Sequence, residues 1–271
     1  MTKLWLLGIA LSAAAPRPLG PPWKELAPGV ATATVADLGG DANWAAKVVL
    51  IDAQRATFAV RYDPSRPTLA AWRARYPNAL AIANGSFYST DGPPGAEVRP
   101  TCDVISAGRQ LRGAGCHRQD ALFFGASGIT PVPAAKSGPL VSTPPPRPQI
   151  LAAADFHPGD WSEALKSFPA LVHGGAAVCT GAHYCAESSR TAAVAQLRDG
   201  RILLFASQWP AVRRQVGKWL ADELGAVEAI NLDGGPEATL ALRGEPLEDS
   251  IGTQGVGLPM VVVLLPPPGA P

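Results

Sequence analysis

Three polar residues stand at the ends of short apolar stretches in this sequence. Asn84 ends ALAIAN and precedes a glycine, Asp233 ends AINLD and precedes two glycines, and Arg190 begins RTAAVAQL. A carboxylate can serve as nucleophile or base in glycoside chemistry, and a guanidinium binds phosphate through two parallel hydrogen bonds. An Asp, an Asn and an Arg on converging loops would therefore suit a phosphorylated or glycosidic ligand.

Each of the three residues also has a structural explanation. Asn84 and Asp233 can simply close turns, because Asn and Asp favour turn positions and Asp-Gly is common in turns. Arg190 can form an exposed ion pair. One at a time, the residues favour the structural explanation, and only their convergence in space would favour a site.

Apolar runs bounded by turn residues predict strands on both sides of these residues. The first half of the chain has strand patterns over residues 30–38, 46–52, 57–63, 79–84 and 121–125. The second half has a hairpin pattern over 190–207, with its turn at 198–200, and strand patterns over 226–232, 238–242 and 257–265. Because ligands sit where the loops at strand ends converge, we predict that Asn84, Arg190 and Asp233 line one cleft.

Two segments have the helical spacing of apolar residues. Residues 67–77 lie between two prolines and place on one face Leu69, Trp72 and Tyr76. Residues 211–225 end at a glycine and place on one face Val212, Val216, Trp219, Leu220 and Leu224. Because this second helix lies between two strands, we predict an α+β or mixed α/β fold, with a single domain whose mixed, largely antiparallel central sheet is flanked by helices.

The composition excludes several classes of protein. Of the 271 residues, 47% are hydrophobic and 17% charged, which favours a sizeable core over disorder. The 28 glycines and 28 prolines disfavour a helix bundle. A net charge of +1 gives no electrostatic reason to expect nucleic acid or an anionic membrane as a partner. No glycine-rich segment matches a P-loop or dinucleotide fingerprint, and we expect no cofactor.

The N-terminus has the features of a secretory signal. Lys3 is followed by the apolar stretch LWLLGIALSAAA and then by PRPLGPP. The apolar stretch is short for a membrane span, so we predict cleavage after Ala14 and a secreted or periplasmic product without stable membrane insertion. A buried N-terminal helix is the alternative.

We expect the chain to be organised in four parts. Residues 1–14 form the signal peptide, and residues 15–44 an N-terminal extension with the first strand. Residues 45–265 form the main domain, in which the Pro-rich segment 133–149 is a surface loop. Residues 266–271 are a flexible tail.

Four cysteines fit an oxidising compartment. Cys102 and Cys116 flank one short loop, and Cys179 and Cys185 flank another. Local pairing within each loop is the simplest of the three possible connectivities. A zinc site made from Cys179, Cys185, His183 and His173 is the alternative, but its spacing is not of the Cys-x-x-Cys type, and we expect no metal.

Several motifs in a fixed order resemble one known family. The order is AIANGSFYSTDGPPG, FPALVHGGAAV, SSRTAAVAQLRDGRILLF, a helix ending in LADELGA, and AINLDGGPEATL. This succession, over roughly residues 45–265, resembles the phosphodiester glycosidase family. The family includes the catalytic domain of N-acetylglucosamine-1-phosphodiester α-N-acetylglucosaminidase and many bacterial exopolysaccharide-associated proteins.

The resemblance implies a set of site residues. Asn84, Gly85 and Phe87 correspond to the family's Asn-Gly-x-Phe turn, Arg190 and Thr191 to its Arg-Thr, and Asp233, Gly234 and Gly235 to its Asp-Gly-Gly, with Thr239 retained beyond it. There are two departures. Where the family commonly has small residues after the double glycine, this chain has Pro236, Glu237 and Ala238, and His173 stands where the family often has another charged residue.

The chemistry of such an enzyme assigns a role to each residue. Hydrolysis of a glycosyl phosphodiester needs a carboxylate as nucleophile or base, which would be Asp233, and a group that stabilises the departing phosphate, which would be Arg190. Asn84 would donate a hydrogen bond to sugar or phosphate, and the glycines would allow close backbone approach.

Glu237, four residues after Asp233, would be the second carboxylate, unless it is only a solvated turn residue. The resemblance therefore implies an exported hydrolase of a glycosyl-1-phosphodiester in a glycan or envelope polysaccharide. A non-catalytic glycan-binding protein with the same cleft is the alternative, and the changes after the double glycine favour it.

Overall fold

The longest strands have six residues and mostly apolar sequences. The computed structural model describes residues 22–89, 97–116, 118, 120–126, 147–181 and 183–267. Strands such as β3 (AKVVLI) and β17 (ILLFAS) are central in an eight-stranded sheet. Its order is β1 (Lys24–Ala27), β2 (Val30–Thr34), β3 (Ala46–Ile51), β17 (Ile202–Ser207), β16 (Ala192–Leu197), β19 (Ala226–Asn231), β13 (Ala170–His173) and β14 (Ala176–Ala177).

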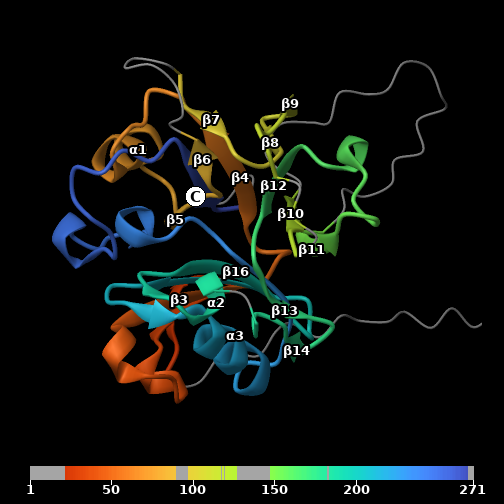
Figure 1. The fold of residues 1–271 in the computed structure, drawn as a ribbon. Helices are drawn as coiled ribbons and strands as arrows, with labels where there is room; N and C mark the ends of the chain where they lie inside the picture. Colours follow the sequence, from red (N-terminus) through yellow and green to blue (C-terminus); the bar gives the residue numbers. More distant parts are fainter. Residues whose placement is uncertain are drawn as a thin grey trace, which may run out of the picture.

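Two smaller sheets lie on one side of the large sheet (Figure 1). The four-stranded sheet has the order β20 (Leu240–Leu242), β5 (Ala81–Asn84), β21 (Met260–Leu265) and β4 (Thr57–Tyr62). The five-stranded sheet has the order β11 (Gln149–Ala152), β10 (Leu122–Ala126), β12 (Glu163–Ser167), β8 (Val104–Ser106) and β9 (Arg109–Leu111). Two short pairs complete the strands: β6 (Tyr88–Ser89) with β7 (Arg99–Pro100), and β15 (Ser188–Ser189) with β18 (Ala211–Val212).

The helices are short. They are α1 (Leu69–Arg75), α2 (His183–Ala186) and α3 (Arg213–Asp222), with the 3-10 turns η1 (Ala36–Leu38), η2 (Ala42–Trp44), η3 (Pro158–Asp160), η4 (Gly235–Glu237) and η5 (Leu247–Asp249). The side chain of Thr68 caps the N-terminus of α1. Figure 1 shows α3 beneath the large sheet and α1 beside the four-stranded sheet.

Alternate residues of the central strands face two different cores. Val49 and Ile51 of β3 pack with residues of both smaller sheets, in the core between the layers. Val48 and Leu50 point to the other face, where Trp219 of α3 packs. Side chains of a strand alternate between its two faces, so the two cores together require β3 to be apolar from Val48 to Ile51.

Every pairing between named strands in the described part of the chain is antiparallel. The predicted mixed sheet is therefore a set of antiparallel sheets, and the predicted flanking by helices holds only for α1 and α3. The strand–helix–strand unit is present, but β17 and β19 do not pair with each other. Strand β16 lies between them and is antiparallel to both. The single sheet-rich domain was predicted.

Most of the predicted elements are found near their expected bounds. The hairpin of β16 and β17 turns at Gly200, whose φ is 85°, and α3 is followed by Gly225 at φ 67°. Both disulfides have the predicted local pairing, Cys102 with Cys116 and Cys179 with Cys185. The sulfur atoms of Cys179 and Cys185 are therefore not available as zinc ligands.

Several predictions fall outside the described residues. They are the signal peptide with its cleavage point, most of the 133–149 loop, and the last four residues of the tail. Within the described residues, no helix is long and apolar enough to cross a membrane.

A buried carboxylate joins the two smaller sheets. Glu163 of β12 is fully buried, and its Oε2 accepts hydrogen bonds from the backbone N–H groups of Val60 (2.9 Å) and Ala107 (3.2 Å). The guanidinium of Arg61 lies 2.8 Å from the same carboxylate. Because β4 is an edge strand, Glu163 satisfies a backbone donor that no neighbouring strand reaches.

We predict that Glu163→Ala lowers the free energy of unfolding by about 3–5 kcal/mol, because it leaves the charge of Arg61 and a buried N–H without a partner. Glu163→Gln, which keeps an acceptor, should lower it less. Urea denaturation measures both, with the exposed Glu248→Ala as control, expected within about 0.5 kcal/mol of the parent. Equal losses for the Ala variants at positions 163 and 248 would contradict the prediction.

Candidate active site

The chain crosses from the large sheet to the four-stranded sheet between Asn231 and Leu240. The side chain of Asn84, at the end of β5, forms hydrogen bonds with this crossing segment. Its side-chain N–H groups donate to the carbonyls of Asp233 (2.7 Å) and Gly85 (3.2 Å), and its Oδ1 accepts from the backbone N–H of Thr239 (2.9 Å). Asn84 is 1% exposed, so its amide is committed to the backbone. The structure thus gives Asn84 a positioning role in place of the predicted bond to a ligand.

Asp233 stands on this crossing. Its backbone N–H donates to the carbonyl of Gly85 (3.0 Å), and its Oδ1 accepts from the N–H of Gly234 (2.9 Å). Burial, and next the negative charge of Glu237, raise the pKa of Asp233 from the usual 3.8 to about 7. The nearby guanidinium groups of Arg213 and Arg66 oppose that shift. A carboxyl pKa near 7 lies in the range that suits a general base at neutral pH.

Glu237 is the second carboxylate, and it is held in place. The hydroxyl of Tyr88, in β6, donates to its Oε1 (2.9 Å), and Nη2 of Arg66 donates to the same hydroxyl (2.9 Å). Burial, followed by the bond to Glu237, raises the pKa of Tyr88, so that the phenol stays a donor at neutral pH. Glu237 thus has fixed partners, unlike the solvated turn residue of the alternative explanation.

Arg66 is a strained residue. Its φ is 55°, a left-handed conformation that costs a non-glycine residue roughly 1–2 kcal/mol. Its guanidinium carbon lies 5.1 Å from the centre of the Tyr88 ring. Strained residues persist where the surroundings hold them, and they often do so at functional sites.

Arg190 meets the crossing from the start of β16. Its Nη2 donates to the carbonyl of Ala238 (3.0 Å), and its Nη1 donates to the hydroxyl of Thr253. Its own carbonyl accepts from the N–H of Gly235 (2.9 Å). Burial lowers the pKa of Arg190, and the charge of Glu237 opposes that shift. Asn84, Arg190 and Asp233 are therefore brought together through contacts with one loop.

Arg213, at the first position of α3, is a third guanidinium in this group. Its Nη1 donates to the carbonyl of Tyr184 (2.7 Å) and its Nη2 to the hydroxyl of Ser189 (2.8 Å). Glu187, which is about half exposed, lies 3.7 Å away. Burial lowers the pKa of Arg213, and the charges of Glu187 and Asp233 oppose that shift.

The two positions after Asp233 require glycine for different structural reasons. A Cβ on Gly234 would lie 2.7 Å from the carbonyl oxygen of Arg190, so the close passage of these two backbones excludes a side chain. Gly235 has φ 62°, where a non-glycine residue would be strained. Both glycines bring the arginine-bearing segment against the carboxylate-bearing one.

The remaining predicted residues lie deeper or to the side. Thr191 is fully buried, and its hydroxyl donates to the carbonyl of Ser189 (3.1 Å). Thr239 is 2% exposed and holds Asn84. Phe87 is partly exposed and stacks on Phe168 with 4.6 Å between ring centres.

The three arginines share one feature. The Nε atoms of Arg66, Arg190 and Arg213 are buried and, within the described residues, have no hydrogen-bond partner. Across the same residues, no guanidinium lies within ion-pair distance of Asp233 or Glu237. Buried donors without partners are uncommon and mark places where a ligand can be bound. The described residues contain no cluster of three His, Cys, Asp or Glu side chains that could hold a metal ion.

Comparison with known proteins identifies the family. A family model for phosphodiester glycosidases matches residues 77–263, more than half of the chain. The chain belongs to the phosphodiester glycosidase family. A search of curated proteins found no match.

Solved structures share the fold of this member of the phosphodiester glycosidase family at low identity. The zebrafish N-acetylglucosamine-1-phosphodiester alpha-N-acetylglucosaminidase catalytic domain, auto-inhibited by its pro-peptide, has a TM-score of 0.56 and 17% identity, over 82% of this chain and 77% of that one. A hypothetical protein from Synechocystis has a TM-score of 0.58 and 15% identity, over 92% of this chain and 64% of that one. A Burkholderia pseudomallei protein provisionally described as exported has a TM-score of 0.55 and 16% identity, over 82% of this chain and 74% of that one. These likenesses show the fold alone.

Sequence reasoning missed Tyr88, Arg66 and Arg213. Tyr88 stands one position after the predicted Phe87, in a segment interpreted as irregular. Arg66 lies next to a proline before α1, and nothing local distinguishes it. Arg213 was included in a predicted helix, where its position in the first turn was an available signal, since basic side chains are unfavourable at a helix N-terminus unless another group holds them.

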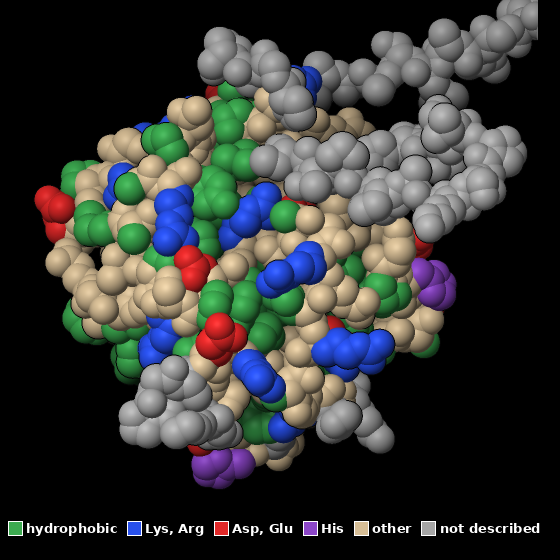
Figure 2. Space-filling model, turned by 90° about the horizontal axis from the view of Figure 1, so that it is seen from above, with side chains coloured by type: hydrophobic (Ala, Val, Ile, Leu, Met, Phe, Trp, Pro, Cys, Tyr) green, Lys and Arg blue, Asp and Glu red, His purple; other side chains and the backbone are tan. Residues whose placement is uncertain are grey.

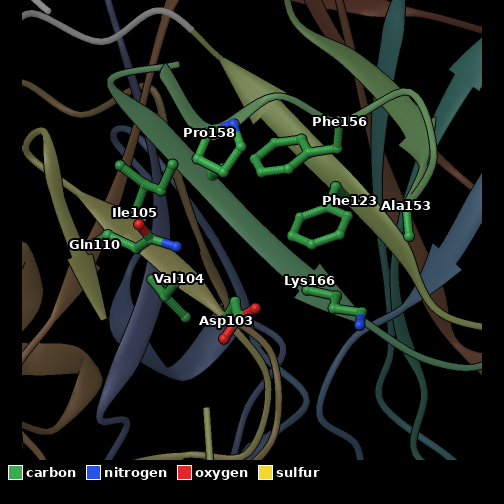
Figure 3. Close-up of a pocket in the computed structure, with 10 residues that line it drawn as sticks. Asp103, Val104, Ile105, Gln110, Phe123, Ala153, Phe156, Pro158 and Lys166 are labelled. Atoms are coloured by element: carbon green, nitrogen blue, oxygen red, sulfur yellow. The ribbon is translucent and has the colours of Figure 1, made fainter. Parts of the chain in front are cut away.

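The surroundings of the site are of mixed character. On the face toward β6 and β7, Lys and Arg side chains lie around an apolar strip with Asp and Glu side chains among them (Figure 2). A separate pocket of about 200 Å³ lies on the five-stranded sheet, where Phe123 and Phe156 stack and Lys166 and Asp103 stand at its edge (Figure 3). None of the predicted site residues lines that pocket.

We predict that Asp233→Asn stabilises the fold in a pH-dependent way. The pKa of Asp233 is about 7 in the folded state against a usual 3.8, so the folded state favours the protonated carboxyl. The stability that this preference contributes is complete below pH 3.8 and is lost as the pH rises through 7. The shift corresponds to at most about 4 kcal/mol at about 1.4 kcal/mol per pKa unit. The unfolding free energy of Asp233→Asn should therefore equal that of the parent near pH 4 and exceed it by roughly 2–4 kcal/mol at pH 8.

Urea denaturation at several pH values checks this prediction. Asp222→Asn, at an exposed carboxylate of α3, serves as control and should show no rise of this size. A difference between Asp233→Asn and the parent that is the same at pH 4 and pH 8 would refute the burial of an ionisable Asp233.

Proposed function

We propose that this protein hydrolyses a glycosyl-1-phosphodiester, releasing a free sugar and a phosphomonoester. The proposal agrees with its membership of the phosphodiester glycosidase family and with the motifs that carry the resemblance. The substrate would be a phosphorylated glycan or an envelope polysaccharide. We further propose that the protein acts outside the cytoplasm, in a secreted or periplasmic form, since its two disulfides suit an oxidising compartment.

One observation carries the proposal. Three half-buried arginines lie around the pair Asp233 and Glu237, and each has a buried Nε–H group without a partner among the described residues. A phosphodiester monoanion offers oxygen acceptors to such donors and charge to the cations. Carboxylates alone would suit many sugar ligands, but the arginines make phosphate the part of the ligand that this site recognises.

The reaction follows from the groups present. The bond between C1 of the sugar and the phosphate oxygen breaks, and that oxygen leaves with its electron pair as part of the phosphomonoester. Arg190 stabilises the charge on the departing phosphate, with Arg66 and Arg213 beside it. Ionised Asp233 either attacks C1, to be displaced by water in a second step, or removes a proton from the water that attacks C1. Since phosphate is a good leaving group, protonation by an acid matters less.

The other residues complete the proposed machinery. Glu237, held by Tyr88, stabilises positive charge at the sugar and adds to the rise that burial causes in the pKa of Asp233. Phe87 offers an apolar ring beside the sugar. Asn84, Thr191 and Thr239 position the loops, and Gly85, Gly234 and Gly235 allow the backbones to approach each other.

A glycan-binding protein without turnover is the second candidate. The sequence Pro236-Glu237-Ala238 favours it, because Glu237 adds a negative charge beside the site where the family commonly has small residues. Assay of the purified protein on a panel of sugar-1-phosphodiesters distinguishes the two candidates. Release of sugar and phosphomonoester supports the enzyme, and binding without release supports the second candidate.

We predict that Asp233→Asn lowers kcat by at least about a thousandfold while ligand binding persists, because it keeps the size and the hydrogen bond to Gly234 but removes the reacting charge. Arg190→Ala should weaken both binding and turnover, since a phosphate clamp acts in the ground state and the transition state alike. Steady-state kinetics and calorimetric binding of the substrate to Asp233→Asn measure these effects. Full activity of Asp233→Asn would remove Asp233 from the mechanism.

A pH profile tests the environment of Asp233. If ionised Asp233 is the base or nucleophile, kcat/KM rises with pH through its pKa, near 7. Because the charge of Glu237 contributes to the raised pKa, we predict that Glu237→Gln moves this rise to lower pH, though not to 3.8, since burial remains. Glu248→Gln, at an exposed site, should leave the profile unchanged. A rise that stays at the same pH in Glu237→Gln would contradict the coupling of the two carboxylates.

A further inference from the structure

A cavity of about 380 Å³ lies beside the candidate site, within the described part of the chain. Its lining comes from the start of β13, the segment before β10, the end of β11 and the loop closed by the Cys179–Cys185 disulfide. Small-molecule sites have volumes of this order. None of the roles assigned above uses this cavity.

Three stacked side chains form a wall that runs from the cavity lining to the site. Arg118 and Tyr184 line the cavity, and Phe168 stacks on Phe87 of the site. The guanidinium of Arg118 lies 4.9 Å from the ring centre of Phe168 and 4.3 Å from that of Tyr184. Asp120 accepts two hydrogen bonds from Arg118 (2.9 and 3.1 Å) and one from the hydroxyl of Tyr184. These contacts neutralise Arg118 and hold the wall together.

Both ends of this wall touch the site. Phe168 stacks on Phe87, which follows Gly85 and the backbone that holds Asp233. The carbonyl of Tyr184 accepts from Arg213, whose Nη2 lies 3.3 Å from the position of a Cβ on Gly234. The cavity therefore begins one side chain away from the arginines that would hold the phosphate.

Part of the cavity lining is apolar. Leu122 and Ala170, both buried, and Pro169 contribute to the lining, and Val178 is a large hydrophobic residue that stays 42% exposed. Because Arg118 is already paired with Asp120, it offers little to a second phosphate. An exposed valine at the mouth of an apolar cavity suits a hydrocarbon group.

We propose that this cavity binds the leaving-group side of the substrate, and that this group is an alkyl or aryl substituent on the phosphate. The inference rests on the proposed function, because it places the sugar at Asp233 and the phosphate at the arginines. The substituent then passes the wall formed by Phe168, Arg118 and Tyr184. The preferred substrate is therefore a phosphodiester that joins a sugar to an apolar alcohol.

The first experiment measures binding without turnover. Calorimetry compares n-hexyl phosphate with methyl phosphate on the full protein, since each buried methylene contributes about fourfold in affinity. We expect n-hexyl phosphate to bind at least tenfold more tightly. Val178→Asp, which brings a charge to the cavity mouth, and Thr180→Trp, which fills the cavity from an exposed position, should each abolish this preference.

A matched control separates the cavity from general hydrophobic binding. Trp209 is 58% exposed and does not line the cavity, so Trp209→Asp should keep the preference for n-hexyl phosphate. The inference is overturned if the parent shows no preference, if both cavity variants keep it, or if Trp209→Asp loses it as they do.

The second experiment measures turnover of two glycosyl-1-phosphodiesters with the same sugar, one carrying a methyl and one an n-hexyl group. In the parent protein we expect a lower KM for the n-hexyl diester than for the methyl diester. Val178→Asp should raise the KM of the n-hexyl diester at least tenfold and leave the kcat/KM of the methyl diester unchanged. Turnover without any preference would overturn the cavity inference and leave the proposed function standing. If neither diester is hydrolysed, the proposed function fails, and the phosphate-binding comparison still decides the role of the cavity.

Discussion

The hydrogen bonds of the Asn84 amide fix the place where the chain passes from one sheet to another. β19 belongs to the eight-stranded sheet and β20 to the four-stranded sheet, and the eight residues from Leu232 to Thr239 join them. Asn84 bonds to both halves of that segment, at Asp233 and at Thr239. Because these bonds are buried, breaking one leaves a donor or acceptor without a partner, at a cost of about 1–3 kcal/mol. The position of both carboxylates depends on this buried side chain.

The burial that positions Asp233 also raises its pKa. A carboxylate in water loses its proton near pH 4 and is a weak base at neutral pH, whereas Asp233 is shifted to about 7 by burial and by Glu237. This shift lowers the stability of the fold above neutral pH, where the buried group must be charged. The fold holds Asp233 through backbone contacts that no single ion pair could replace, and the guanidinium groups nearby moderate the shift without forming an ion pair with it. Stability is reduced at the place where reactivity is needed.

The parts of the structure that depend on neighbours in sequence could be predicted, and those that depend on distant partners could not. The β16–β17 hairpin and the two disulfides are local, and the sequence patterns indicate them. The motif residues were found because they follow strand ends, although they converge for another reason: the loops meet where the chain crosses between antiparallel sheets, not at one edge of an open parallel sheet. Strand β12 was missed because its first residue is Glu163, whose burial depends on Arg61, 102 residues away. Tyr88 and Arg66 were missed for the same reason, since only the fold brings them to Glu237.

The three arginines show how the site differs from an ordinary cluster of ion pairs. Each donates hydrogen bonds to neutral groups: Arg66 to a phenol, Arg190 to a carbonyl and a hydroxyl, and Arg213 to a carbonyl and a hydroxyl. Arg213 has in addition an ion pair with Glu187, outside the pair Asp233 and Glu237. Each charge is therefore oriented without being neutralised by the two carboxylates, and each retains a buried Nε–H group that has no partner in the described residues. Arg66 adds backbone strain to this arrangement. A fold tolerates such groups when the surrounding contacts hold them, and an anion that accepts from them gains binding energy without the entropy cost of ordering the side chains. Preorganised cations around an uncommonly basic carboxylate are what the cleavage of a sugar–phosphate bond requires, because negative charge grows on the phosphate as positive charge grows on the sugar.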